Sequence, residues 1–460
     1  MRLRVIVPAA LAAITVSLGC AGTANAASAG HSRDDQPSRL AQLIGRQSLP
    51  ANDGWAASGT GTSGGAAATA DEVFVVHNRG ELVNALGGNN ATNATNTTPK
   101  IIYVSGSVNA NVDDANQPVG CDAYADPGYT LDAYLAAYDP AVWGRTSKPS
   151  GPLEDARARS AKNQGARINI NVGSNTTIIG LPGARLTGAN LLIQNVDNVI
   201  VRNLTLQDAH DCFPVWDPTD GSTGNWNSAY DTLSVIGATH VWVDHCDFSD
   251  GNNPDSDQPE YLGRPYQVHD GLLDITKGAD LVTASNNYLH DHDKSMLIGS
   301  TDSPTYDVGK LRVTLHNNRF ANLGQRGPRV RFGQVDIYNN LYDIPNATGP
   351  FAADGYSYSW GVGHLSAIYA QNNAIMLGSG VDPSKVVYNW GGTAMTEKGT
   401  WIGQGRRFSP ASALAAFNAA NPTAVIGTDA GWTPTLRTLV LPTAVVPVVV
   451  GLTAGTKLLG

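Results

Sequence analysis

Three aspartates, Asp231, Asp270 and Asp274, have a spacing that could bring their carboxylates together. Asp270 and Asp274 are four residues apart, and an even spacing places two side chains on the same face of a strand. Asp231 opens an earlier strand-like segment, residues 232–235, so stacked strands could gather all three. Converging carboxylates repel one another unless a cation lies between them, and Ca²⁺ takes roughly six to eight oxygen ligands. The spacing therefore predicts a calcium site; the alternative is three separate, solvated aspartates.

A set of basic residues could bind the carboxylates of an acidic ligand. Lys294 ends the polar segment 290–294, and Arg326, Arg329 and Arg331 lie within a stretch of six residues. Arg329 and Arg331 are two residues apart, so both face the same side of a strand. Arginine captures carboxylates through two parallel hydrogen bonds. These residues predict a carboxylate-binding surface; the alternative is an ordinary basic turn.

Two other polar groups are weaker signals. Residues 250–257 are rich in Asp and Asn but lack the ligand order of an EF-hand, so we interpret them as a turn. His290 and His292 are too few to make a metal site by themselves.

The overall charge limits the classes of partner. The formal net charge is -9, and only 15% of the residues are charged, whereas glycines number 50. A protein that bound nucleic acid through overall charge would be basic, so we expect no nucleic-acid partner. An acidic ligand would need local cations or a bound metal to overcome the repulsion. The composition is typical of an extracellular all-β protein.

The N-terminus has the features of an export signal. Arg2 and Arg4 precede an apolar run over residues 5–18, and Ala24-Asn25-Ala26 supplies a small-x-small cleavage pattern. Cys20 raises a lipoprotein alternative, although Ser17 occupies a position where a lipobox favours Leu. We expect a signal peptide over residues 1–26 and a secreted protein without a membrane anchor.

Three cysteines, Cys121, Cys212 and Cys246, remain after this cleavage. An odd number in an exported protein allows one disulfide and one free thiol. Cys246 lies inside a strand-like run, which favours a small buried core residue. The spacing alone does not pair Cys121 with Cys212.

A short unit recurs from about residue 168, in which strand-like residues are closed by Asn or another polar residue. Its instances are residues 199–203, 241–245, 281–287, 313–318, 335–340 and 368–373. Asn318 and Asn340 are 22 residues apart, and longer intervals fit loops inserted into a fixed repeat. This period predicts an all-β, right-handed parallel β-helix, in which Asn occupies the tight bends and stacks between turns. A β-propeller would need repeats of about 40 residues with four strands.

Other segments complete the expected domain organisation. Residues 27–54 are expected to be an exposed lead-in, and residues 55–460 the β-helix domain. A strand over residues 73–76 precedes a short capping helix that begins after Asn78, with Glu81 three residues further on. The apolar run 439–452 contains two prolines and is short for a membrane span, so we expect an extended strap packed on the solenoid.

Together these motifs resemble the pectate lyases of polysaccharide lyase family 1, particularly the secreted bacterial ones. The resemblance runs from about Trp55 to the C-terminus. It rests on residues 216–221, Val241-Trp242-Val243-Asp244-His245, the segment 290–294 and the R-x-P-x-x-R motif from Arg326 to Arg331.

The resemblance implies a role for each residue of the two charged sets. Asp231, Asp270 and Asp274 match the calcium ligands, Lys294 and Arg331 the substrate-carboxylate binders, and Arg326 the proposed base. Asp244 and His245 match a motif near the site with a structural role. Some relatives carry a further Asp where this chain has Ala229, which puts an additional calcium ligand in doubt.

The implied reaction is calcium-dependent β-elimination on α-1,4-polygalacturonate, giving 4,5-unsaturated oligogalacturonates. An arginine base is unusual because free arginine stays protonated at ordinary pH, so hydroxide could act in place of Arg326. A pectin lyase would need no calcium, a polygalacturonase would hydrolyse the bond with paired carboxylates, and a wall-binding protein would not need Lys294 with Arg326. We expect a monomer.

Overall fold

The computed structural model describes residues 37–346, 355–405 and 407–459, and most of its strands form three sheets. Sheet I contains β1 Val73–Val76, β2 Lys100–Val104, β5 Thr176–Gly180, β8 Asp197–Arg202, β13 Thr239–Asp244, β18 Asp280–Ser285, β21 Val313–His316, β24 Gln334–Tyr338, β27 Ala367–Gln371 and β30 Met395–Lys398. Sheet II contains β3 Ser107–Asn109, β6 Arg185–Thr187, β9 Thr205–Gln207, β14 Asp247–Ser249, β19 Tyr288–Lys294, β22 Arg319–Gln325, β25 Leu341–Asp343, β28 Ala374–Leu377, β31 Trp401–Gln404 and β32 Arg407–Pro410. Sheet III contains β4 Asn169–Asn171, β7 Asn190–Gln194, β12 Leu233–Ile236, β17 Leu273–Thr276, β20 Leu297–Ile298, β23 Arg329–Val330, β26 Trp360–Gly363 and β29 Val387–Trp390.

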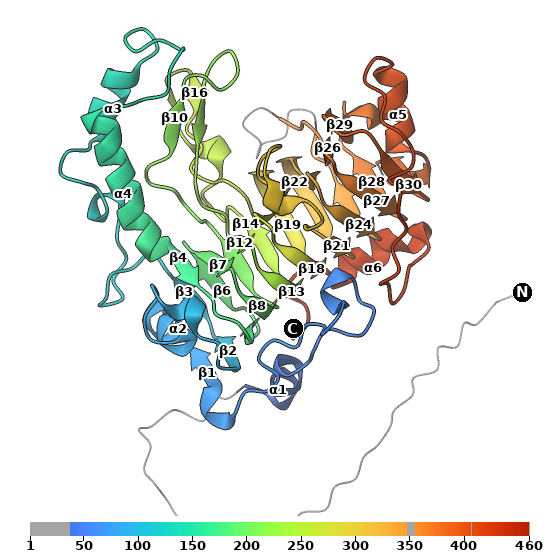
Figure 1. Ribbon diagram of the computed structural model, residues 1–460, viewed down its shortest axis with the longest axis horizontal. Helices are drawn as coiled ribbons and strands as arrows, with labels where there is room; N and C mark the ends of the chain where they lie inside the picture. The colour runs from blue at the N-terminus through green and yellow to red at the C-terminus, as the bar shows by residue number, and fades with distance from the viewer. Residues whose placement is uncertain (1–36, 347–354, 406, 460) are drawn as a thin grey trace, which may run out of the picture. The chain divides into compact units, whose positions relative to one another are not determined.

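The chain passes through the three sheets in a fixed order. β17, β18 and β19 lie in sheets III, I and II, and β20 returns the chain to sheet III. Ile275 pairs with Ile298, so this turn advances the chain by 23 residues. Neighbouring strands of the three sheets pair in parallel, apart from β31 with β32. Figure 1 shows the strands stacked side by side along the molecule. The predicted right-handed parallel β-helix is confirmed.

The core is built from rows of residues that are aligned by the strand register. In sheet I, one inward row is fully buried and consists of Val199, Val241, Val282, Val313, Val335 and Ile368. Burying one such side chain stabilises the fold by about 1.5–3 kcal/mol. A single turn cannot bury its own inner face, so each turn depends on its neighbours.

The corner between sheets I and II has the same length in seven consecutive turns, with two residues joining β8 to β9 and so on to β31. The first corner residue has φ between 51° and 62° and is, in order, Asn203, His245, Asn286, Asn317, Asn339, Asn372 and Gly399. This left-handed backbone is unfavourable for most residues but accessible to Asn and Gly. The predicted use of Asn at the tight bends is confirmed.

The second corner residue builds a buried ladder of amides. It is Asn in four consecutive turns, at Asn287, Asn318, Asn340 and Asn373. Asn287 donates both its backbone N–H and its Nδ2 to Oδ1 of Asn318, at 2.9 and 3.0 Å. Asn318 makes the same pair of bonds to Asn340, and Asn340 to Asn373. The ladder satisfies buried polar groups while it fixes the register of successive turns.

The N-terminal end is capped by helix α2, Arg79–Leu86. Oδ1 of Asn78 accepts the N–H of Glu81 at 3.0 Å, which satisfies one of the free donors at the helix start. Leu82 and Leu86 are fully buried in the main core. The predicted strand 73–76 and capping helix are confirmed.

The expectation of an exposed lead-in over residues 27–54 is wrong for residues 37–54. Helix α1, Arg39–Gly45, buries Ala41, and Leu49 is also buried. Leu49 packs against Ile200 and Trp242, two outward side chains of sheet I. This apolar outer surface needs a cover, which the sequence pattern did not reveal. The predicted signal peptide, residues 1–26, lies outside the described residues.

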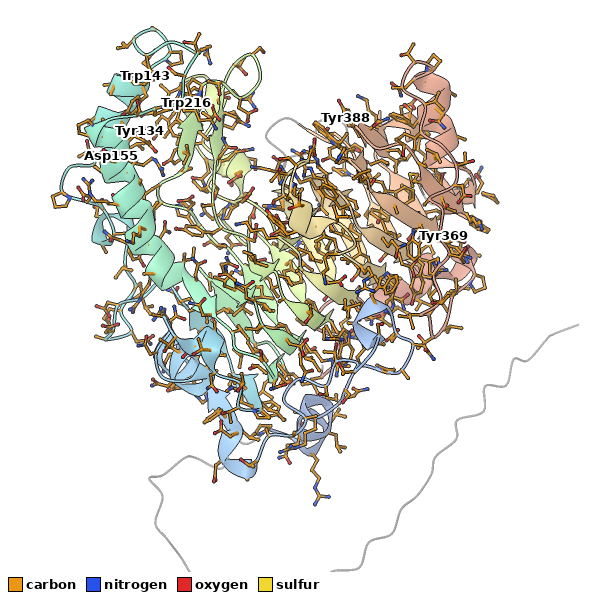
Figure 2. The ribbon with its side chains drawn as sticks, in the orientation of Figure 1. Tyr134, Trp143, Asp155, Trp216, Tyr369 and Tyr388 are labelled. Carbon is orange, nitrogen blue, oxygen red and sulfur yellow. A yellow bond between two sulfur atoms is a disulfide. The ribbon has the colours of Figure 1, made fainter. Side chains whose placement is uncertain are left out.

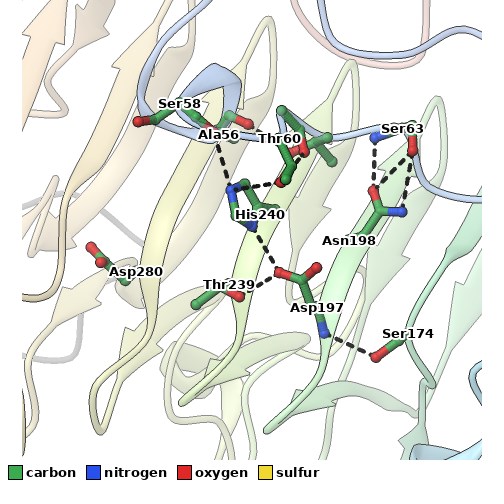
Figure 3. A network of polar contacts seen from close by, with 12 residues as sticks. Ala56, Ser58, Thr60, Ser63, Ser174, Asp197, Asn198, Thr239, His240 and Asp280 are labelled. Carbon is green, nitrogen blue, oxygen red and sulfur yellow. Dashed lines mark hydrogen bonds and ion pairs between the residues drawn. The ribbon is translucent and has the colours of Figure 1, made fainter.

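Figure 3 shows how the following segment is held on the same face of sheet I. Nδ1 of His240 lies 2.7 Å from a carboxylate oxygen of Asp197, and its Nε2 lies 3.1 Å from the carbonyl oxygen of Ser58. The backbone N–H of Ser63 donates to Oδ1 of Asn198 at 2.7 Å. Polar contacts therefore extend the cover that Leu49 begins.

The C-terminal run is helical where an extended strap was expected. Helix α6, Val446–Thr453, has Pro447 in its first turn, where proline needs no N–H partner. Val446 and Val450 pack with Leu341 on the solenoid, so the predicted packing is right although the conformation is not. Within the described residues, no helix is long and apolar enough to cross a membrane.

The cysteines are resolved as one bridge and one buried thiol. Cys121 and Cys212 form a disulfide with Cα atoms 5.4 Å apart, and Cys246 is free and fully buried. The pairing was left open by the sequence, and the expectation that Cys246 is a core residue is confirmed.

His290 links two turns of sheet II. Its Nε2 lies 3.2 Å from Asp247 in β14, its Nδ1 lies 2.7 Å from Asp291, and its ring stacks on Tyr288. Burial alone lowers the pKa of His290, but Asp247 and Asp291 outweigh it and raise the pKa to about 9. His290 is therefore an ion-pair partner that links β14 to β19.

We expect Asn318→Ala to destabilise the fold by about 2–4 kcal/mol, because it leaves buried partners on both neighbouring turns unsatisfied. The measurement is the free energy of unfolding in urea. Lys162→Ala is the control, since Lys162 is exposed on helix α4, Pro152–Ile168, and its loss should cost less than about 0.5 kcal/mol. Equal losses for the two variants would contradict a stabilising ladder.

We expect part of the stability to be lost as the pH rises from 6.5 towards 9. The folded-state pKa of His290 lies above the ordinary value of 6.5, so its ion pairs stabilise fully below pH 6.5 and are lost as the pH rises through about 9. The contribution is at most about 3 kcal/mol. The measurement is the midpoint temperature of thermal unfolding as a function of pH. Between pH 7 and 9.5 this midpoint should fall less steeply for His290→Gln than for wild type, whereas His240→Gln should retain the wild-type dependence that comes from His290.

Candidate functional site

The predicted aspartates and arginines lie in the strands of sheet III or in the segments directly next to them. Asp274 in β17 pairs with Ser234 in β12, and Leu297 in β20 pairs with Arg329 in β23. Ile275, the neighbour of Asp274, is fully buried in the core. Because side chains alternate along a strand, Asp274 and Arg329 both face outward, two strands apart.

The carboxylates of Asp231 and Asp274 converge beside Gly271. A Cβ atom at Gly271 would lie 2.6 Å from Oδ1 of Asp274 and 2.7 Å from Oδ1 of Asp231, so only glycine leaves this space open. Gly271 N–H donates to Oδ1 of Asp231 at 3.0 Å, and Ser234 Oγ donates to its Oδ2 at 2.6 Å. The N–H of Leu297 donates to Oδ1 of Asp274 at 2.8 Å. Sequence analysis missed Gly271, although a glycine at a strand start is a signal of close approach.

The three aspartates affect one another electrostatically. Burial, followed by the charge of Asp270, raises the pKa of Asp231 to about 7. Burial and the charges of Asp231 and Asp270 raise the pKa of Asp274 well above its usual range. Buried carboxylates of like charge disfavour ionisation, which is why their pKa values rise. A divalent cation bound between them would lower these pKa values again, because it favours the ionised carboxylates. The oxygen-only donors of Asp231 and Asp274 and the space at Gly271 are of the kind that suits a hard divalent cation such as Ca²⁺.

Lys294 and Arg326 lie beside this acidic cluster. Nζ of Lys294 is 3.6 Å from Oδ1 of Asp270. Arg326 follows β22 with φ 62°, and within the described chain its buried Nε has no hydrogen-bond partner. Burial alone lowers the pKa of Arg326, but Asp270 and Asp274 outweigh it and raise the pKa above the ordinary value. The guanidinium is therefore charged.

Arg331 belongs to the same face but does not contact the aspartates. Its Nε donates to Oδ1 of Asp302 at 2.6 Å, and its Nη1 donates to the Gly299 carbonyl at 2.9 Å. With strands about 4.8 Å apart and about 3.3 Å per residue, its Cα lies about 12 Å from that of Asp274. Asp302 was missed by sequence analysis because it lies in a loop with no pattern around it.

Two glycines make room for the arginines. Gly361 pairs with Arg329, and a Cβ there would lie 3.0 Å from Cγ of Arg329. A Cβ at Gly363 would lie 3.2 Å from Cγ of Arg331. The guanidinium of Arg329 stacks over Trp390 at 3.9 Å, and burial with the nearby Arg331 lowers the pKa of Arg329 to about 10. The predicted basic surface is thus an ordered part of sheet III.

Asp244 and His245 do not lie beside the aspartates, contrary to the expectation for their motif. They end β13 in sheet I, where Asp244 accepts Nε and Nη2 of Arg202 at 2.9 and 2.8 Å. Arg202 also stacks over Trp242 at 4.2 Å. Arg202 and His245 hold the pKa of Asp244 below its usual range even though burial raises it. The expected structural role agrees with this buried network.

One side of sheet III carries an aromatic layer. Helices α3, Leu131–Tyr138, and α4 stand there with the hairpin of β10, Val215–Asp217, and β11, Asn225–Asn227 (Figure 1). Figure 2 shows Tyr134 and Trp216 among the side chains of this layer, and Trp216 lies 5.2 Å from Trp226. α4 runs directly into β4, so this layer is fixed to the start of sheet III.

Comparisons with known proteins agree with this geometry. The family model described as pectate lyase matches residues 150–424. A pectate lyase of Bacillus subtilis (strain 168) is 49% identical over 86% of this chain and 89% of its own length. Pectate lyase E of Dickeya chrysanthemi is 35% identical over 76% of each chain.

Solved structures give the same result. A thermostable pectate lyase, PL 47, superposes with a TM-score of 0.87 at 48% identity, covering 91% of this chain and 100% of that one. A pectate lyase bound to a hexasaccharide superposes with a TM-score of 0.84 at 47% identity, with the same coverage. With the sheet III face and these relatives together, the chain belongs to the pectate lyase family and is a polysaccharide lyase.

Proposed function

We propose that this enzyme cleaves α-1,4-polygalacturonate by β-elimination with Ca²⁺ as its cofactor, releasing 4,5-unsaturated oligogalacturonates. The observation that carries the proposal is the convergence of Asp231 and Asp274 at Gly271, with Asp270 and Lys294 beside them. A relative bound to a hexasaccharide supports an oligosaccharide ligand on this fold.

Ca²⁺, when bound, would supply positive charge to a uronate carboxylate and make the C5 proton more acidic. Asp231, Asp270 and Asp274 would hold it, while Lys294 and Arg331 bind the carboxylate of the substrate as it gains enolate character. The charged guanidinium of Arg326, which lies near Asp270 and Asp274, supports a role close to the sugar. The C5 proton would go to Arg326 in its neutral form or, while the charged guanidinium stabilises charge, to hydroxide. The C4–O bond then breaks, the leaving oxygen takes a proton from water, and a C4–C5 double bond remains.

The rival activities use different residues. A pectin lyase would need no calcium, and three clustered aspartates on sheet III give it no advantage. A polygalacturonase would need one carboxylate as acid and another as base across the glycosidic bond, without the arginines around Arg326. The acidic cluster next to cations therefore favours a calcium-dependent lyase over both.

We also propose that the enzyme is secreted as a monomer. The support for secretion is the signal-like segment 1–26, the disulfide between Cys121 and Cys212, and a composition low in charge. The net charge of -9 gives no basis for a nucleic-acid partner, so the acidic substrate would depend on the local cations of sheet III.

We expect activity on polygalacturonate, followed by the ultraviolet absorbance of the unsaturated product, to vanish in chelator and return with Ca²⁺ more than with Mg²⁺. Asp231→Asn should weaken Ca²⁺ binding by at least about 1.4 kcal/mol, which is tenfold. Asp257→Asn, which changes an exposed aspartate, is the control. Full activity in chelator would support a pectin lyase, and new reducing ends without the chromophore would support a hydrolase.

We expect the rate to fall as the methyl-ester content of the pectin rises, at fixed Ca²⁺. An ester removes the charge that Lys294 and Arg331 bind and leaves desolvated cations unpaired. Arg331→Ala should lose about 10²-fold in rate and most of the selectivity, whereas Arg185→Ala, on the exposed start of β6, should retain both. Equal rates on highly esterified pectin and on polygalacturonate would refute the roles of Lys294 and Arg331.

A further inference from the structure

A second cluster of ligand-type side chains lies outside the charged face of sheet III. Asp208, His210 and His269 each bring one ligand atom within 4.8 Å of the others. Nε2 of His269 is 3.1 Å from Oδ1 of Asp208. In a tetrahedral metal site, donors about 2.0–2.2 Å from the ion lie about 3.3 Å apart, so this pair already has a suitable separation.

The histidine of this pair is oriented by a carboxylate on its other nitrogen. Nδ1 of His269 lies 3.0 Å from Oδ1 of Asp255, and that oxygen also accepts the N–H of Val268 at 3.0 Å. Both Asp255 and His269 are almost completely buried. A metal-binding imidazole usually ligates the ion through one ring nitrogen and donates the N–H of its other ring nitrogen to a carboxylate. In His269 these would be Nε2 and Nδ1, respectively.

The second histidine has an unprotonated ring nitrogen, which accepts a hydrogen bond from Asn253 in the absence of an ion. Nδ2 of Asn253 lies 3.1 Å from both Oδ1 of Asp208 and Nδ1 of His210. The Asn253 amide is oriented by Gln258, whose Nε2 donates to its Oδ1 at 2.7 Å. Nδ2 is therefore the donor, so Nδ1 of His210 accepts and carries no proton.

The cluster is reachable from solvent. Asp208 and His210 line a cavity of about 180 Å³, together with polar side chains that include Asn109, Asn111 and Gln164. A cavity of this size holds water, and water can complete the coordination of an ion bound by three protein ligands.

We propose that Asp208, His210 and His269 form a binding site for a divalent transition-metal ion such as Zn²⁺ or Co²⁺, with Asp255 orienting His269 and water from the cavity as a further ligand. Two imidazoles and one carboxylate suit these ions, whereas Ca²⁺ prefers oxygen ligands alone. The site is therefore chemically distinct from the three aspartates of sheet III. It ties the end of β9 to the segment that leads into Asp270.

The disulfide sulfurs of Cys121 and Cys212 also lie within 4.8 Å of a ligand atom of His210. A disulfide sulfur is not a thiolate and is a poor ligand, so the site must be tested with the bridge intact. Reductant would create two new thiol ligands and obscure the result.

The experiment titrates the purified, chelator-stripped protein with Co²⁺, without reductant and with saturating Ca²⁺ present. We expect one equivalent to bind, with visible d–d absorption, and Zn²⁺ to displace it. Asp208→Asn and His210→Gln should each weaken binding at least tenfold. His240→Gln is the matched control, because it changes a histidine of another His–Asp pair, on sheet I (Figure 3).

Binding that is absent from the wild type, or that both variants retain in full, would overturn the proposal and leave a buried histidine–carboxylate network. If either variant fails to fold, as judged by circular dichroism, a Zn²⁺-soaked crystal of the wild type decides. An anomalous peak between Asp208, His210 and His269 supports the site. If all anomalous peaks lie elsewhere, the proposal is refuted.

Discussion

Hydrogen-bonded register between parallel turns is the constraint on which the other features of this enzyme depend. It aligns Ser234 with Asp274 and Leu297 with Arg329, although these residues are 40 and 32 positions apart in the chain. A slip of one residue would turn every outward side chain of the strand into the core. The Asn ladder prevents such a slip, because each amide is bonded to the equivalent amide of the next turn. The positions of the charged side chains on sheet III therefore depend on the register that is fixed at the corner between sheets I and II.

The charged side chains at sheet III affect one another, so none of them can be understood alone. Asp231 and Asp274 are buried beside each other at a cost that raises the pKa of both, and Lys294 and Arg326 lie close enough to respond. In a chain with net charge -9, such a cluster would repel an acidic polymer unless cations outnumbered the carboxylates locally. Arg329, Arg331 and a bound divalent ion would make the local charge positive. The charges that affect the stability of this face would then also affect its affinity for substrate.

Much of the fold could be predicted because the physical signals are local and repeated. Each sheet I strand from β8 to β27 is followed by a polar residue that adopts the left-handed bend, and the pattern returns every turn. The expected reason for pairing Asp270 with Asp274, one shared strand face, is wrong, because Asp270 lies before the start of β17. The two aspartates still influence each other electrostatically. The two prolines of the C-terminal run were misleading. A proline breaks a helix when it lies in the middle, but Pro447 lies in the first turn of α6, where proline is well tolerated.

Other features could not be predicted because they depend on contacts between distant segments. The burial of Leu49 requires knowledge that sheet I exposes Ile200 and Trp242. The bond between Asp302 and Arg331 joins a loop to a strand, and the space at Gly271 appears only when two turns are stacked. Residues 250–257, interpreted as a turn, contain a turn at residues 251–252 and a short 3-10 helix, Asp255–Asp257. Asp250 and Asp255 are buried with histidines, which composition alone does not indicate.

The constant two-residue corner has a consequence for how such an enzyme can change in length. An insertion there would interrupt the amide ladder and displace every later turn, so the corner should reject added residues. The connections into sheet III differ: two residues separate β19 from β20, whereas 23 separate β14 from β17. New segments can therefore be accepted beside the charged face without moving it. The solenoid separates the part of the chain that must keep its length from the part that is free to acquire new substrate contacts.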